Sequence, residues 1–217
     1  MESTDPKILN PWVAMWTQPR ATIQQIVDTN PKRFVLPLAA LVGFSRYLDS
    51  CSYKNTGEVL EWPRIILLAG AIGPILGLLA LYIGGWLLRW TGKWVGGNAS
   101  LQNIRAAIAW SGVPILWALL LWIPALLLFG QELFTKETPI LSASSSLSST
   151  FLVYGLIDIV IAIWAFVVFL KCLGQVQGFS AWKALLNGFL ALFSCITLIA
   201  IPVFIALQVS YYLVSIL

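Results

Sequence analysis

The sequence predicts an all-α membrane protein with five transmembrane helices, a short amphipathic N-terminal interfacial helix and an N-in/C-out orientation. The first observation is composition, because 59% of the 217 residues are hydrophobic and only 10% are charged. A soluble domain has about 25% charged residues. The second observation is a series of five long apolar stretches, and the third is the distribution of basic residues between the loops. A compact soluble fold with so few charges could not cover its own surface, so lipid must cover it.

The chain divides into an N-terminal cytosolic or interfacial segment, residues 1–30, and a transmembrane domain, residues 31–217. Asn10 followed by Pro11 is a helix start signal, and Pro19 opens a second short helix. This segment is too polar to span a bilayer. Two interpretations stay open: an amphipathic element that lies on the lipid headgroups, or a helix packed on the cytoplasmic face of the protein itself.

Five apolar stretches follow the N-terminal segment. They cover residues 33–48, 63–90, 104–129, 150–170 and 182–213. A bilayer core about 30 Å thick needs about 20 helical residues. Four stretches reach that length alone, and the first reaches it when it is extended over residues 31–49. Breaks are expected at Pro74, Pro114 and Pro124, because proline removes a backbone donor inside a helix.

The loop charges predict the orientation. Nine basic residues fall on the N-terminal side of the alternating spans, against four on the other side, which also holds most of the acids. Because basic residues collect in cytoplasmic loops, the N-terminus is predicted inside and the C-terminus outside. We interpret eight of the nine as a basic cytosolic face. These are Arg20, Lys32, Arg33, Arg89, Lys93, Arg105, Lys171 and Lys183.

Two segments share a spacing of one basic residue and two glycines. They are residues 89–96 (RWTGKWVG) and 171–178 (KCLGQVQG). Each follows a predicted span and leads to a serine and a basic residue before the next span. The pattern is interpreted either as two copies of one helical hairpin or as the ordinary composition of two inner turns.

The sequence offers little chemistry for catalysis. It contains no histidine, which excludes imidazole-based hydrolysis and histidine-ligated metals, and it has no glycine-rich phosphate loop. The cysteines Cys51, Cys172 and Cys195 are scattered and support neither a disulfide framework nor a metal site. No enzymatic activity, cofactor or metal is expected. Nucleic-acid binding is not expected either, because membrane topology accounts for the basic residues.

Asp158 is the one acid inside an apolar stretch, and a carboxylate at that depth must face the bundle interior and find a partner. It is either part of a proton or polar-substrate site or a structural acid that joins helices. Arg46 and Asp49 can form a local pair or reach a polar group on another span, and with Asp158 they make a candidate intramembrane polar site. Gly73 and Gly77 form a GxxxG step, which predicts close helix packing.

Three motifs resemble those of a known family. They are NPW at residues 10–12 with PRATI at 19–23, IRAAIAWSGVP at 104–114, and KCLGQVQGFSAW at 171–182. Together they resemble bacterial members of the Yip (Ypt/Rab-interacting protein) family, and the resemblance implies a five-span membrane fold. Eukaryotic relatives bind prenylated Rab GTPases. This sequence lacks their long N-terminal region and their Asp-Leu-Tyr-Gly-Pro and Gly-Tyr motifs, so Rab binding is not carried over.

Two functional hypotheses follow. The first is a non-enzymatic scaffold or adaptor in the cytoplasmic membrane of a prokaryote, which organises membrane or recruits partners at the basic cytosolic face. The second is a small transporter or lipid-handling protein with a midplane site near Asp158. The lipid bilayer is the expected partner in both cases, and binding to other membrane proteins and homo-oligomerisation stay open.

Overall fold

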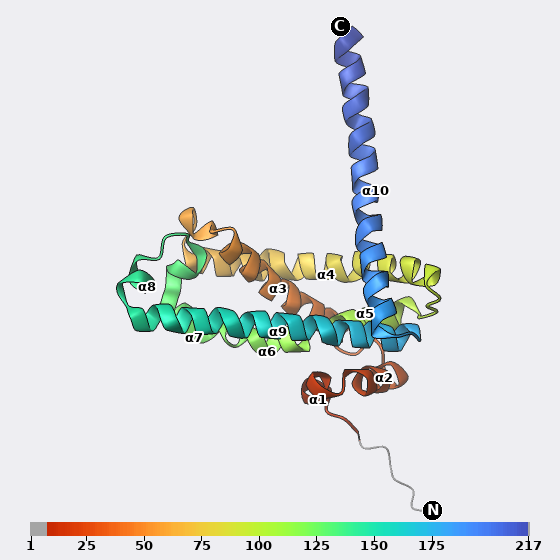
Figure 1. Cartoon of the computed structure of the whole chain (residues 1–217), viewed down its shortest axis with the longest axis horizontal. Coiled ribbons are helices and arrows are strands. Elements are labelled where there is room, and N and C mark those ends of the chain that lie inside the picture. Colours follow the sequence, from red (N-terminus) through yellow and green to blue (C-terminus); the bar gives the residue numbers. More distant parts are fainter. Residues whose placement is uncertain (1–7, 217) are drawn as a thin grey trace, which may run out of the picture.

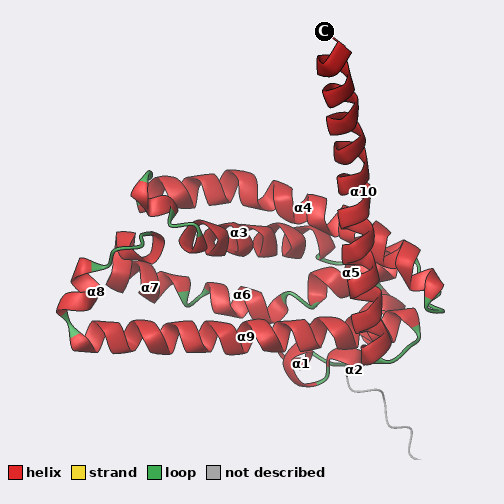
Figure 2. Cartoon of the chain, turned by 45° about the horizontal axis from the view of Figure 1, so that its top comes forward, coloured by secondary structure: helices red, strands yellow, loops and turns green. Residues whose placement is uncertain are grey.

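The computed structural model describes residues 8–216, apart from several side chains near the end of the last helix. Two short helices lead into the fold, α1 (Pro11–Thr17) and α2 (Pro19–Thr29). The remaining elements are α3 (Val35–Tyr53), η1 (Thr56–Glu58), α4 (Trp62–Trp94), α5 (Leu101–Trp110), α6 (Val113–Leu119), α7 (Trp122–Phe129), η2 (Gly130–Phe134), α8 (Pro139–Ala143), α9 (Ser145–Gln177) and α10 (Ala181–Ile216). Every regular element in the described range is helical, which confirms the predicted all-α class (Figure 2).

The N-terminal segment forms two helices that pack on one end of the bundle (Figure 1). The Asn10 side chain caps α1 by accepting a hydrogen bond from the Trp12 backbone N–H (3.1 Å), as the start signal predicts. Met15, Ile23 and Ile26 are at most 4% exposed. These helices therefore pack on the protein itself, and their position relative to the lipid headgroups stays a prediction.

Two tryptophans of the bundle form hydrogen bonds with α1. The indole N–H of Trp164 on α9 donates to the Trp16 carbonyl oxygen (3.1 Å), and that of Trp117 on α6 donates to the Trp12 carbonyl oxygen (3.2 Å). These bonds satisfy carbonyl groups of a seven-residue helix too short to be stable alone. The two indoles therefore orient α1 as well as filling space.

α3 crosses α4 at close range through small residues on both helices. A Cβ atom added to Gly43 would overlap the carbonyl oxygen of Gly73 and lie 2.6 Å from the Cα of Gly77. A Cβ atom added to Gly77 would overlap the carbonyl oxygen of Ala39. Gly73 and Gly77 therefore lie in this contact, and the step from Ala39 to Gly43 supplies the matching small-residue surface on α3.

The third apolar stretch is divided into α5, α6 and α7. Pro114 is the second residue of α6 and Pro124 the third of α7, so each of these two predicted breaks is confirmed. The break predicted at Pro74 is wrong, because α4 continues through it. A proline ring meets the carbonyl group four residues earlier. That residue is Gly70, which lies within the same continuous helix.

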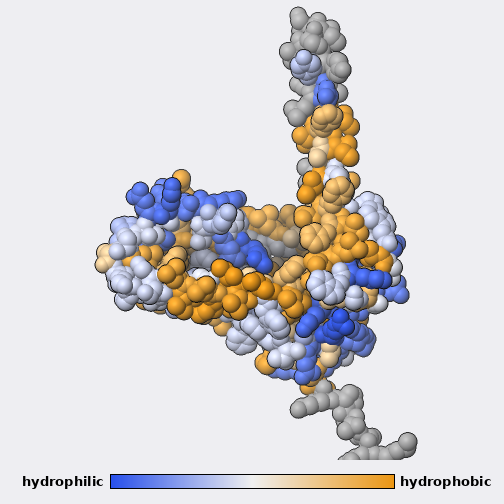
Figure 3. Space-filling model, in the orientation of Figure 1, coloured by the Kyte–Doolittle hydropathy of each residue, from blue (hydrophilic) through white to orange (hydrophobic). Residues whose placement is uncertain are grey.

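Four helical segments among the described residues are long and apolar enough to cross a membrane. They are Trp62–Trp94, Leu101–Phe134, Ser145–Gln177 and Ala181–Ile205. They coincide with four of the five predicted spans. α3 has 19 residues but carries Arg46 and Asp49, and it is not among them. Figure 3 shows apolar surface along α9 and α10 and polar surface towards the two ends of the bundle.

α10 differs from the other long helices in direction. Its first part packs on α9 and α4, and its remainder projects away from the bundle (Figures 1 and 2). A helix that crosses α4 and α9 does not share their direction through a bilayer. The five-span count and the N-in/C-out orientation therefore stay predictions.

A buried polar network joins α4, α9 and α10. The Thr91 hydroxyl donates to Asn187 Oδ1 (2.6 Å), and both residues are fully buried. Asn187 Nδ2 and Gln177 Nε2 each donate to the Leu88 carbonyl oxygen at 3.1 Å. Gln177 Oε1 accepts from the backbone N–H of Ala99 (3.3 Å). Three helices and a loop are thus held by amide groups in an otherwise apolar interior.

The two similar segments at residues 89–96 and 171–178 perform the same local task. Their last glycines, Gly96 (φ +89°) and Gly178 (φ +77°), adopt the left-handed conformation that ends α4 and α9. Ser100 then caps α5, and the Ser180 hydroxyl accepts from the Lys183 N–H (3.3 Å) at the start of α10. The glycines that end one helix and the serines that begin the next are sufficient to account for the spacing that the two segments share.

Candidate functional site

A hollow separates α9 from α3. α9 packs on α2, α5 and α6 towards the basic end of the bundle and on α8 at the other end, and it has no extensive contact with α3 or α4. Polar surface is visible in the space between α9 and the α3–α4 pair (Figure 3). The helix α7 and the turn η2 contribute Trp122 and Leu133 to the lining of this space.

The hollow contains a cavity of about 540 Å³ that brings together the three residues of the predicted intramembrane polar site. Arg46 and Asp49 come from α3, and Asp158 comes from α9. The complete lining is Arg46, Asp49, Ser50, Ser52, Tyr53, Trp122, Leu133, Phe151, Tyr154, Gly155 and Asp158. One cation, two acids and four hydroxyl groups therefore face a space walled by aromatic and aliphatic side chains.

The helical period explains why these residues converge. On α3 the lining residues 46, 49, 50 and 53 follow the spacing i, i+3, i+4, i+7, and on α9 the residues 151, 154, 155 and 158 follow the same spacing. Such a spacing places side chains on one face of a helix. The cavity therefore lies between two facing helical stripes, each carrying acid and hydroxyl groups on an otherwise apolar helix.

The charged groups of the cavity come from two facing helices. Arg46 and Asp49 lie on α3, and Asp158 and Tyr154 lie on α9. Arg46 is exposed, whereas Asp49 and Asp158 are half-buried. With two carboxyl groups and one guanidinium group, the lining of this cavity holds more acids than cations.

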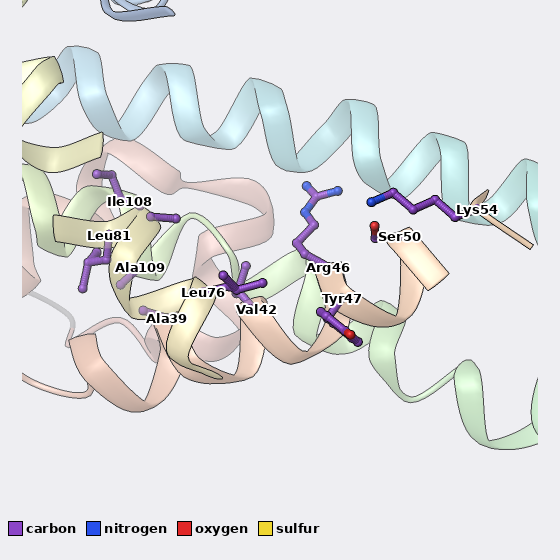
Figure 4. Close-up of a pocket in the computed structure, with 13 residues that line it drawn as sticks. Ala39, Val42, Arg46, Tyr47, Ser50, Lys54, Leu76, Leu81, Ile108 and Ala109 are labelled. Atoms are coloured by element: carbon purple, nitrogen blue, oxygen red, sulfur yellow. The ribbon is translucent and has the colours of Figure 1, made fainter. Parts of the chain in front are cut away.

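A second cavity of about 390 Å³ shares Arg46 and Ser50 with the first. Its lining runs along α3 from Ala39 as far as Lys54, and most of the residues that it does not share with the first cavity are aliphatic. Those residues are Ala39, Val42, Gly43, Tyr47, Lys54, Leu76, Gly77, Ala80, Leu81, Ile108 and Ala109. In Figure 4 the Arg46 side chain points towards α9, with Lys54 and Ser50 at the same end and the aliphatic residues at the other. The first cavity thus has a largely polar lining, and the second has a largely aliphatic one.

Several lining residues were not predicted from the sequence. Tyr154 lies one turn before Asp158 on the same face of α9, so the period would have found it. Ser50 on α3, and Lys54 directly after α3, extend the Arg46 stripe in the same way. Trp122 carried no such signal, because its helix begins only at the break before Pro124.

The eight residues of the predicted basic face lie on elements that meet at the other end of the bundle. These elements are α2, the turn before α3, the end of α4, α5, the end of α9 and the start of α10 (Figure 1). Three of the cations lie over aromatic rings: Arg105 over Tyr82, Lys171 over Trp164 and Arg33 over Phe34.

The described residues contain no group of three or more His, Cys, Asp or Glu side chains that could hold a metal ion. Cys51, Cys172 and Cys195 are all free thiols. The chemistry of the cavity between α3 and α9 suits binding. Its hydroxyl, carboxylate and guanidinium groups can orient a polar group, and the aliphatic second cavity can take an apolar tail.

An all-helical chain with four apolar helices of spanning length defines a polytopic integral membrane protein. The family model described as the Yip1 domain matches residues 13–214, and the chain belongs to that family. The resemblance to the Yip family stated from the three motifs is thereby confirmed, and the bacterial origin stays a prediction. No curated protein and no solved structure matches the chain significantly.

Proposed function

We propose that this protein binds and handles a small amphipathic molecule within the membrane, as a lipid-handling protein or small transporter. The observation that supports the proposal is the convergence of Arg46, Asp49 and Asp158 on one cavity, which shares Arg46 with a largely aliphatic second cavity along α3. A purely structural acid would be expected in a packed contact without space beside it. Here about 540 Å³ lies next to Asp158.

The arrangement of the lining favours a zwitterionic polar group. The acids Asp49 and Asp158, with the rings of Trp122 and Tyr154, suit a cationic ammonium group. Arg46, at the junction of the two cavities, suits a phosphate or carboxylate group. The aliphatic lining of the second cavity suits a hydrocarbon chain. A zwitterionic lipid combines these three features.

The test uses the protein reconstituted in proteoliposomes with fluorescent phosphatidylethanolamine as the probe. If the cavity handles such a molecule, Asp158→Asn lowers probe binding or transbilayer movement about tenfold, because it removes a charge-assisted contact. Glu137→Gln is the matched control, since it makes the same acid-to-amide change at an exposed residue outside the cavity. Unchanged probe behaviour in Asp158→Asn would count against the proposal.

The scaffold or adaptor role remains the second candidate. It is supported by the gathering of the basic residues at one end of the bundle, where Arg89 and Lys93 are exposed. In the membrane topology that we propose, with five spans, the N-terminus inside and residues 1–30 on the cytosolic side of a prokaryotic cytoplasmic membrane, this end faces the cytosol. The same vesicles separate the two roles, because recruitment of a partner depends on Lys93 and not on Asp158.

A further inference from the structure

A third cavity lies at the basic end of the bundle, away from the acids Asp49 and Asp158. It measures about 330 Å³ and opens between the turn before α3, the middle of α4 and the start of α5. Its lining consists of Pro31, Lys32, Val35, Leu36, Leu81, Tyr82, Gln102 and Arg105. Two cations and one amide face this space, and no acid does.

The Arg105 side chain packs against Tyr82 and Gly85, and one of its N–H groups has no hydrogen-bond acceptor. Its guanidinium carbon lies 4.0 Å from the centre of the Tyr82 ring. Its stem passes over Gly85, where an added Cβ atom would come within 3.1 Å of the Arg105 Cγ. The Arg105 Nε is buried and has no hydrogen-bond partner. Arg105 as a whole is half-buried and lines the cavity, so its guanidinium group can donate charge-assisted hydrogen bonds to an anion there.

The aromatic residues of α4 indicate the level of this cavity relative to the lipid headgroups. Trp86, Trp90 and Trp94 form a ladder of ring contacts with centroid distances of 5.7 and 4.8 Å, and all three are exposed. Exposed tryptophans of a spanning helix sit at the level of the headgroups. Tyr82 is one turn deeper than Trp86, so the polar mouth of the cavity lies at the headgroup boundary.

The remaining walls are apolar. Val35 and Leu81 are buried and Leu36 is 49% exposed, so a hydrocarbon chain leaving the mouth would run over aliphatic surface. We propose that this cavity is a binding site for a phosphate group, carried by the headgroup of an anionic membrane lipid, with Arg105 as the principal ligand and Lys32 as the second. This site is independent of the cavity between α3 and α9.

The test measures binding of dioctanoyl phosphatidylglycerol to the full-length protein in detergent, with dioctanoyl phosphatidylcholine and inorganic phosphate in parallel. Arg105→Gln is expected to weaken phosphatidylglycerol binding about tenfold, because it removes a charge-assisted contact to phosphate. Lys32→Gln is expected to weaken it about fivefold, because Lys32 lines the cavity and supplies the second charge-assisted contact to the phosphate. Lys32 is exposed, so this second variant is not expected to disturb folding.

Arg89→Gln is the matched control, since it removes one exposed positive charge from the same end of the bundle without touching the cavity. Its affinity for phosphatidylglycerol is expected to equal that of the unaltered protein. If inorganic phosphate bound as tightly as the lipid and depended equally on Arg105, the phosphate site would stand and its source would be a soluble anion. If neither ligand depended on Arg105, or if Arg89→Gln lost as much affinity, the proposal would be overturned.

Discussion

Replacing Gly43 by alanine is expected to separate α3 from α4 and to abolish the monodisperse folded protein. The added methyl group would overlap the Gly73 carbonyl oxygen and lie 2.6 Å from the Gly77 Cα. These neighbours are backbone atoms, which cannot move aside as a flexible side chain can. The loss of stability should therefore exceed the roughly 1–3 kcal/mol typical of overpacking. Size-exclusion chromatography and thermal unfolding in detergent measure the effect.

Gly70→Ala on α4 is the matched control for this substitution. Nothing lies within 4 Å of a Cβ atom built at Gly70, so the methyl group enters open space. Because alanine has the higher helix propensity, the control should be neutral or stabilised by up to about 1 kcal/mol. A Gly43→Ala protein with the unfolding temperature of the control would show that the two helices do not cross here.

Replacing Gln177 by alanine is expected to give the second-largest effect on folding. The substitution leaves the buried Ala99 N–H without its acceptor and removes one of two donors to the Leu88 carbonyl oxygen. It also empties the space next to Gly92 and Gly97, where an added Cβ atom would overlap the amide of Gln177. Unsatisfied groups and the new cavity together should cost about 2–3 kcal/mol. The unfolding temperature in detergent reports the loss.

Gln175→Ala makes the same change two residues earlier on the same helix. Gln175 is half-buried, and its amide donates to Gln24 of α2 (3.1 Å). Because water or headgroups can replace this partly exposed bond, the control should lose less than about 1 kcal/mol. Equal losses in the two variants would mean that the polar network does not hold α9 against α4.

Much of the helical architecture could be predicted from the sequence because it depends on local chemistry. The Asn10 cap, the breaks before Pro114 and Pro124 and the four apolar spans each follow from residues close together in the chain. Pro74 was misjudged because the tolerance of a proline depends on the space around the preceding turn. The direction of α10 had no local signal either, since loop charges indicate a side of the membrane and not a packing angle.

The candidate site was only partly predictable for the same reason. The charges of Arg46, Asp49 and Asp158 stand out against apolar surroundings, and the helical period adds Tyr154 to the same face. That the stripes on α3 and α9 face one another is a matter of tertiary packing. The glycine contact between α3 and α4 sets the position of the first stripe, and the contacts of α9 with α2, α5 and α6 set that of the second.

The central claim is that a hydrated polar cavity lies inside the membrane domain beside Asp158. It is tested most directly by thiol labelling of Gly155→Cys in a background where the three native cysteines are replaced by alanine.

Gly155 lines the cavity and has open space for a side chain, whereas its neighbour Leu156 is 62% exposed and lies outside the cavity. With a water-soluble, membrane-impermeant thiosulfonate reagent, we expect rapid labelling of Gly155→Cys and almost none of Leu156→Cys, because a thiol in lipid stays protonated and unreactive. Equal labelling of the two positions, or no labelling of Gly155→Cys, would contradict the account.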